Sequence, residues 1–96
     1  MHPHTPDALP EPSPDVVWRR LNDEVVLVHL PTNRIFSLNA TGARLWELLS
    51  EDGSRAAIEE RIRKEFGVTR EEVTAAVEAL ISELLRERLV RARSTL

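Results

Sequence analysis

The sequence contains no cysteine, so it can form no disulfide and offers no thiolate nucleophile and no cysteine ligand for zinc. It also lacks any apolar run near the roughly 18 residues that a membrane span needs. The N-terminus has no basic segment followed by an apolar one, as a signal peptide would have. These absences are typical of a protein from a reducing compartment, and we expect a cytoplasmic location.

The chain is short and has a small net charge. Its 96 residues make one domain, and a hydrophobic content of 42% permits a core but leaves little interior for a deep catalytic pocket. Thirteen basic residues against sixteen acidic ones give a net charge of -3, which argues against a protein that mainly neutralises phosphates. Every basic residue except Lys64 is an arginine. This favours helix faces with Glu–Arg pairs or, alternatively, an arginine patch that meets an acidic peptide or a partner enzyme.

No group of residues in the sequence predicts catalysis or cofactor binding. His29 stands alone, and the neighbours Glu59 and Glu60 would point about 100° apart on a helix, so they would not converge on one substrate. His2 and His4 lie in a segment without the further ligands that a zinc site requires. We therefore predict that the protein is not an enzyme and has neither a metal nor a cofactor.

The N-terminal segment is rich in proline. Residues 1–14 hold five of the six prolines, and proline has no backbone N–H to donate to a helix or a strand ladder. We expect this segment to be a disordered tail outside the fold. The predicted domain then covers residues 15–91, and residues 92–96 are expected to form a flexible end.

Three strand patterns follow the tail in quick succession. Residues 16–20 and 34–38 are rich in β-branched and aromatic side chains, and residues 24–30 form a more strongly apolar run between them. Short turn signals, Asn22-Asp23 and Pro31-Thr32-Asn33, separate the strands. We expect an antiparallel meander whose middle strand is covered on both faces.

Local start signals predict three helices after the strands. Asn39 caps a helix over residues 40–50, in which Trp46 lies on the apolar face and is expected in the core. Ser54 caps a second helix, which Gly67 ends. The expected fold class is α+β, a three-stranded antiparallel sheet followed by three helices, similar to a winged helix.

The third helix carries more apolar surface than one contact needs. Thr69 and Glu72 have the spacing of a capping box ahead of this helix, over residues 70–88. Its apolar side chains cover an arc of about 180°, whereas one core contact needs about 100°. Packing of both flanks against the other helices, or against a second copy, would also use the excess. The expected core line is Val73, Val77, Leu80 and Leu84, and the flank left over is either Ala76 with Leu80 or Ile81 with Leu85.

The third strand, residues 34–38, has few features that protect a sheet edge. It holds one charge, Arg34, and neither proline nor glycine interrupts it. An edge strand presents unpaired N–H and C=O groups that another strand can use. If this strand lies beside the free flank of the third helix, the two form a groove with backbone groups on one wall and apolar side chains on the other. Such a groove suits an extended peptide bound by strand addition.

Residues 31–50, where the third strand runs into the first helix, resemble the PqqD-like family. Two further helices, joined by residues 65–68, follow in the same order as in the family, so the resemblance covers roughly residues 16–90. Members are RiPP recognition elements, which bind the leader segment of a ribosomally made precursor peptide and present it to a modifying enzyme. The matching residues are Leu38, Asn39, Thr41, Gly42, Ala43, Leu45, Trp46, Leu48 and Leu49.

The resemblance implies a non-catalytic peptide-binding protein, and we expect a monomer or a weak homodimer. The end of the chain just after the third helix suggests a stand-alone form. In the family the leader adds as a strand antiparallel to the third strand and lies against the last helix. The partner of a family member is a leader peptidase, acting with a cyclase, in lasso-peptide synthesis. In pyrroloquinoline quinone synthesis the partner is a radical SAM enzyme. The helix start of this sequence favours the lasso type. Carried over, the peptide-binding positions are Arg34, Ile35, Phe36, Ser37 and Leu38 on the strand, and Val73, Ala76, Val77, Leu80, Ile81 and Leu84 on the helix.

Two other functions fit the same elements. A winged-helix DNA-binding protein would need basic or amide side chains on its outward helix face, but the longest helix carries a series of glutamates instead. A small homodimeric interaction module is the second alternative. A basic cluster at the end of the chain still permits weak contact with nucleic acid, although we expect neither nucleic acid nor membrane as a partner. Its members are Arg86, Arg88, Arg91 and Arg93.

Overall fold

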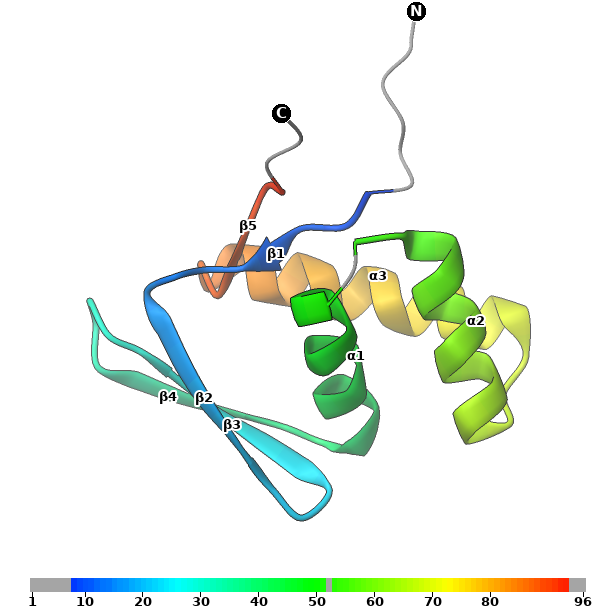
Figure 1. The fold of residues 1–96 in the computed structure, drawn as a ribbon, viewed down its shortest axis with the longest axis horizontal. Coiled ribbons are helices and arrows are strands. Elements are labelled where there is room, and N and C mark those ends of the chain that lie inside the picture. Colours follow the sequence, from blue (N-terminus) through cyan, green and yellow to red (C-terminus); the bar gives the residue numbers. More distant parts are fainter. Residues whose placement is uncertain (1–7, 52, 94–96) are drawn as a thin grey trace, which may run out of the picture.

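The structure is a computed structural model that describes residues 8–51 and 53–93. It has the α+β architecture predicted from the sequence, with three helices on one side of a three-stranded sheet (Figure 1). Its elements are β1 (Glu11–Pro12), β2 (Val16–Leu21), β3 (Glu24–His29), β4 (Arg34–Leu38), α1 (Ala40–Glu51), α2 (Arg55–Phe66), α3 (Arg70–Arg86) and β5 (Val90–Arg91).

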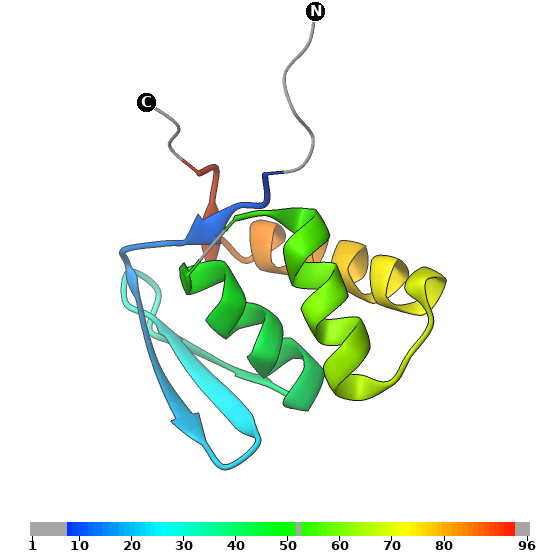
Figure 2. The same ribbon diagram turned by 45° about the vertical axis from the view of Figure 1, so that its right-hand side comes forward.

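The main sheet is an antiparallel meander in the order β2-β3-β4, as predicted. The turns before and after β3 use Asn22 and Asn33 at φ values of 57° and 59°, a left-handed region that asparagine tolerates better than most residues. Along β3, alternate residues from Val25 to His29 are buried, and those between them are half-buried. The prediction that both faces of the middle strand are covered is therefore wrong, since the described helices all lie on one side of the sheet (Figure 2).

The helices begin at the predicted local signals, and α2 ends at one, whereas α3 ends at Arg86, two residues before its predicted end. The side chain of Asn39 accepts a hydrogen bond from the backbone N–H of Gly42 at 3.0 Å and so caps α1. Ser54 caps α2, and Gly67 ends it with a φ of 65°. The predicted capping box at the start of α3 is complete. Because these signals are local, they could be recognised from the sequence alone.

The core lies between the inner face of the sheet and the helices. Trp46 is fully buried there, which confirms its predicted position, and the ring of Trp18 meets it edge to face with centroids 6.4 Å apart. The expected core line of α3 is wrong in one place, because Leu80 is only half-buried and Ile81 is in the core. The residues that α3 buries are Val73, Val77, Ile81 and Leu84.

The two ends of the described chain pair with each other, which the sequence did not predict. β1 and β5 form a two-stranded antiparallel ladder (Figure 1), and Leu9 is 4% exposed within the core. The backbone N–H groups of Leu9 and Ser13 donate to the carbonyls of Gly53 and Leu89 at 2.7 and 3.0 Å. The prolines allow this pairing because residues between them still supply N–H groups.

The predicted tail over residues 1–14 is therefore wrong for residues 8–14, and residues 1–7 lie outside the described part. The C-terminal end is held as well: Arg93 donates hydrogen bonds to the carbonyl oxygens of Leu9, Pro10 and Leu49 at 3.1, 3.2 and 2.8 Å. A Cβ on Gly53 would collide with the Arg93 side chain, so this glycine leaves room for it. The expected flexible end is thus wrong for Arg93, while residues 94–96 are not described.

Candidate functional site

An open groove of about 620 Å³ lies between the end of β4, the start of α1 and one flank of α3. The structure thus brings together the strand and the helix that the sequence suggested as two walls, and it opens the groove toward Ala76 and Leu80. The groove is mostly apolar, with a few polar groups at its rim. The residues that line it are Ser37, Leu38, Asn39, Thr41, Gly42, Ala76, Ala79, Leu80 and Glu83.

Small residues keep the groove open. A Cβ on Gly42, in the first turn of α1, would lie 3.3 Å from both Cβ of Leu38 and Cδ2 of Leu80. Any side chain at this position would therefore press against Leu38 and Leu80. On the opposite wall, Ala76 and Ala79 are exposed and offer only methyl groups. The space between the walls can accordingly accept side chains from another molecule.

β4 is both a wall of the groove and an edge of the main sheet. It pairs with β3 on one side, and no strand in the described part of the chain pairs with its other side. Its side chains alternate as predicted: Phe36 and Leu38 face the core, and Ile35 and Ser37 face away from it. Alternate N–H and C=O groups of such an edge point outward, so β4 can accept a further strand.

An ion pair joins the two walls at the start of β4. Arg34 Nη1 lies 2.7 Å from Oε1 of Glu87, just beyond α3, and the same guanidinium lies 5.0 Å from the centre of the Phe36 ring. The exposure of Arg34 keeps the contribution of this pair to stability small. At the rim, Arg86 Nη1 is 2.6 Å from Oε1 of Glu83, so the negative charge of Glu83 is balanced within α3.

The structure divides the predicted peptide-binding residues into two groups. Periodicity alone could not separate them, because core and groove occupy adjacent arcs of the same helix. Leu38 belongs to the core and also lines the groove. The accessible or half-buried positions are Arg34, Ile35, Phe36, Ser37, Ala76 and Leu80. The positions buried in the core are Leu38, Val73, Val77, Ile81 and Leu84.

The groove also contains residues that the sequence did not single out as binding positions. Two of them, Ala79 and Glu83, continue the flank of Ala76 and Leu80 at the i, i+3, i+4, i+7 spacing of one helix face, so helical periodicity could have found them. The other three precede or open α1, within the motif that carries the family resemblance. They are Asn39, Thr41 and Gly42.

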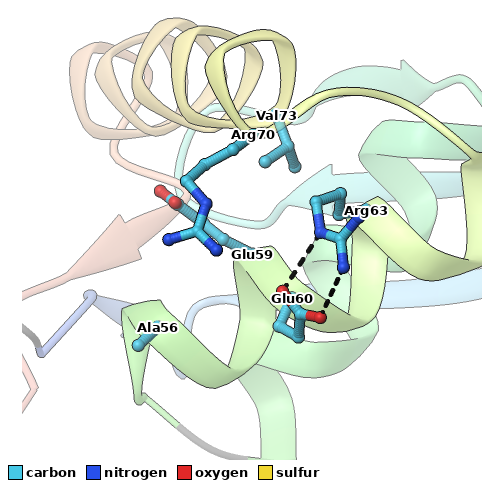
Figure 3. Close-up of a pocket in the computed structure, with 6 residues that line it drawn as sticks. All are labelled: Ala56, Glu59, Glu60, Arg63, Arg70 and Val73. Carbon is cyan, nitrogen blue, oxygen red and sulfur yellow. Dashed lines mark hydrogen bonds and ion pairs between the residues drawn. The ribbon is translucent and has the colours of Figure 1, made fainter.

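A smaller cavity of about 130 Å³ lies between α2 and α3 and is lined by charged side chains (Figure 3). Arg63 donates two hydrogen bonds to the Glu60 carboxylate at 3.1 and 2.7 Å, and they lower the pKa of Glu60. Glu59 accepts hydrogen bonds from Thr74 Oγ1 and Arg55 Nε, both at 2.9 Å. Each carboxylate already has a partner, so this cavity is a polar contact between two helices.

The isolated histidine of the domain has a structural environment. His29 is buried at the end of β3, and its Nδ1 lies 2.8 Å from Oγ1 of Thr32. Across residues 8–51 and 53–93, no cluster of three or more metal-ligating side chains could hold an ion. None of the helices in this part of the chain has the length and apolar character needed to cross a membrane.

Comparisons with known proteins agree with this geometry. A family model described as coenzyme PQQ synthesis protein D (PqqD) matches residues 24–90. The solved structure of TbiB1 in complex with the TbiA(beta) leader peptide is 33% identical in sequence, with a TM-score of 0.81 over 88% of this chain and 99% of that one. Lasso peptide synthetase B1 complexed with the leader peptide is 21% identical, with a TM-score of 0.73 over 83% of this chain and 93% of that one, which supports the fold alone. No curated protein matches the sequence.

Proposed function

The chain belongs to the PqqD family, and from this premise we propose that it is a non-catalytic RiPP recognition element that captures the leader segment of a precursor peptide and presents it to a modifying enzyme. The family is the one expected from the sequence. The observation that carries the proposal is the groove between the unpaired edge of β4 and the small-residue flank of α3. Both similar solved structures contain a leader peptide, which supports a peptide as the occupant.

In the proposed complex the leader adds to the main sheet as a strand antiparallel to β4. Its backbone pairs with the outward N–H and C=O groups of β4, and each bond contributes about 1 kcal/mol. Leader side chains then alternate between two environments. One set enters the groove beside Ala76 and Ala79, and the other lies outside it beside Ile35. Backbone pairing supplies affinity for many sequences, and the groove supplies preference among them.

The modifying enzyme is proposed to be a leader peptidase acting with a cyclase. The helix start, which resembles the lasso type, favours this pathway over a radical SAM enzyme of quinone synthesis, and the fold is similar to that of a lasso peptide synthetase B1. The cytoplasmic location expected from the sequence remains a prediction. The proposed role needs no catalytic group, metal or cofactor on this chain.

The structure does not favour DNA binding through the C-terminal arginines. Arg91 pairs with Glu11 at 3.0 Å, and Arg93 lies 3.8 Å from the same carboxylate while it holds three backbone carbonyls. Arg86 pairs within α3. Among the described residues, Arg88 alone of the four has no ion pair, and one exposed guanidinium is too little to retain a nucleic acid at physiological salt.

The proposal can be tested with two neighbouring alanines of α3. Ala75 and Ala76 are both exposed, but only Ala76 lines the groove. Aspartate at either position adds the same charge and the same loss of helix propensity. Titration of the leader peptide encoded beside the gene should show binding weakened about tenfold or more by Ala76→Asp, a change of about 1.4 kcal/mol. Ala75→Asp should bind within about twofold of the parent, because its charge lies in solvent.

The strand wall is tested by Ser37→Pro, which removes a backbone donor and disturbs the edge of β4. We expect a loss of about 1 kcal/mol in leader binding for each main-chain bond that fails to form. Circular dichroism and urea denaturation must show that each variant is folded. The proposal fails if folded variants at both walls bind as tightly as the parent, or if the parent does not bind its leader.

A further inference from the structure

The face of the main sheet that points away from the helices carries an apolar row across all three strands. Val17, Val28 and Ile35 are register partners on β2, β3 and β4. Leu30 follows the end of β3, two residues beyond Val28, and its backbone N–H donates to the carbonyl of Asp15 just before β2. Val17, Leu30 and Ile35 are 50%, 52% and 70% exposed. We call Val17, Val28, Leu30 and Ile35 the outer row.

This row lacks the usual pattern of a half-solvated antiparallel sheet, in which the solvent face is polar. The described helices all lie on the opposite side of the sheet, as Figures 1 and 2 show from two directions. Single exposed apolar side chains are common, but a contiguous set on three neighbouring strands is typical of an interaction site. The outer row therefore indicates a partner that covers it.

A second copy of this chain is a poor candidate for that partner. Three strands about 4.8 Å apart, each with about five residues at about 3.3 Å, give a footprint on the order of 240 Å². Two copies face to face would bury on the order of 500 Å², well below the roughly 1,200 Å² of a stable specific interface. The partner must therefore reach beyond the outer row.

The surface next to the row is the proposed peptide site. Ile35 lies on β4, so a leader strand added to β4 would become a fourth strand whose outward side chains continue the row. A protein that covers the row and this strand together gains the missing area and contacts the peptide directly. On the same face Arg19, the register partner of Val26, is exposed and has no ion pair in the described part of the chain.

We propose that the outer row is the docking surface for the enzyme that modifies the bound peptide, and that the enzyme offers an apolar surface with a carboxylate opposite Arg19. This inference rests on the proposed leader binding. It assigns the two partners to different places: the peptide contacts the β4 edge and the groove, and the enzyme contacts the solvent face of the sheet. Substitutions on β2 and after β3 can therefore separate the two interactions.

Val17→Glu and Leu30→Glu are the test variants, because neither residue lies on β4 or lines the groove. Leu85→Glu on α3 is the matched control, since Leu85 is also apolar and 47% exposed but lies away from the sheet face. The probe is the modifying enzyme encoded beside the gene, titrated against the full chain with its leader bound. We expect both test variants to weaken enzyme binding about tenfold or more and the control to stay within about twofold.

Leader binding by all these variants should stay within about twofold of the parent. Arg19→Glu should also weaken enzyme binding and reduce its dependence on salt. Equal enzyme affinity for the parent and both test variants would overturn the inference, whereas a parent that fails to bind leader would overturn the proposed function instead. Multi-angle light scattering measures whether the parent is a monomer or a dimer. If the parent is a dimer and Val17→Glu converts it to a monomer, the outer row contacts a second copy and the inference is overturned.

Discussion

The two flanks of α3 are both apolar in sequence, but one lines an open groove and the other packs into the core. On one flank Ala76 and Leu80 line an open groove. On the other Ile81 is buried, and the terminal segments come to Leu85, where Ala8, Leu9, Pro10, Ala92 and Arg93 surround a shared hollow. The wide apolar arc of this helix therefore serves two purposes, packing in the core and forming one wall of the groove.

This difference shows that surplus apolar surface on a helix does not by itself indicate a binding site. The terminal segments lie beside Leu85 on the closed flank and leave it 47% exposed. Hydrogen bonds between residues far apart in sequence hold these segments in place, such as those from Arg93 to Leu9 and Pro10. The open flank stays open because Gly42 and Ala76 leave space that no described segment fills. Substitutions at matched positions on the two flanks test this difference.

The largest effect is expected from a charge on the closed flank. Ile81→Asp places an unpaired carboxylate in the core, so it should cost about 4 kcal/mol or more and leave the protein unfolded at moderate temperature. Ala76→Asp on the open flank should keep the free energy of unfolding within about 0.5 kcal/mol of the parent. Urea denaturation followed by circular dichroism measures both. A folded Ile81→Asp protein that had lost only leader binding would reverse our assignment of the two flanks.

A chain that begins at Asp15 removes the cover of the closed flank. It loses the burial of Leu9, about 2 kcal/mol, and the main-chain bonds of β1, about 1 kcal/mol each. We expect the thermal midpoint to fall by more than about 10 °C. Because the groove is built by other elements, the folded fraction should still bind leader. A midpoint within a few degrees of the parent would instead support the dispensable tail predicted from the sequence.

A glycine-to-alanine substitution can be made near each flank of α3, at Gly53 beside Arg93 and at Gly42 in the groove. Gly53→Ala should displace Arg93 from its three carbonyl acceptors and cost about 1–3 kcal/mol of stability, with leader affinity unchanged. Gly42→Ala should change stability by less than about 1 kcal/mol, since a better helix former offsets the close contact with Leu80. It should instead weaken leader binding severalfold by pushing Leu80 into the groove. Equal effects of both variants on stability and on binding would contradict the separation of the two sides.

The smallest effect is expected at an ion pair outside both flanks. Arg44 of α1 donates hydrogen bonds to both carboxylate oxygens of Glu65 of α2 at 2.8 and 3.1 Å, which lowers the pKa of Glu65. A carboxyl with a lower pKa in the folded state adds stability above its ordinary pKa of about 4.3, and this stability is lost as the pH falls through the lowered value.

Arg44→Gln should therefore make the thermal midpoint less sensitive to acid below about pH 5. The change should be small because the pair is partly exposed and screened by water. Leader binding at neutral pH should not change. A pH profile of the variant that matches the parent throughout the acid range would show that this pair contributes nothing to folding.

Local signals in the sequence were enough to predict the main sheet, the three helices and the family, but not β1 and β5. The cap at Asn39, the stop at Gly67 and the box at Thr69 act within one turn of the chain, and the alternation in β4 depends on neighbours two residues apart. Such signals need no knowledge of distant partners, so strand order, helix starts and the buried position of Trp46 could all be predicted. The β4 edge was predictable for the same reason, because no charge or proline after Arg34 protects it.

Which flank of α3 is open depends on contacts that form only in the folded chain. Ile81 and Leu80 are equally apolar, but Ile81 shares the core with Leu9, which lies near the other end of the chain in a segment whose prolines suggested disorder. The pairing of β1 with β5 likewise joins the two ends of the domain. Contacts of this kind leave no periodic trace in the sequence, because burial of a side chain depends on which distant segment arrives beside it rather than on its own neighbours.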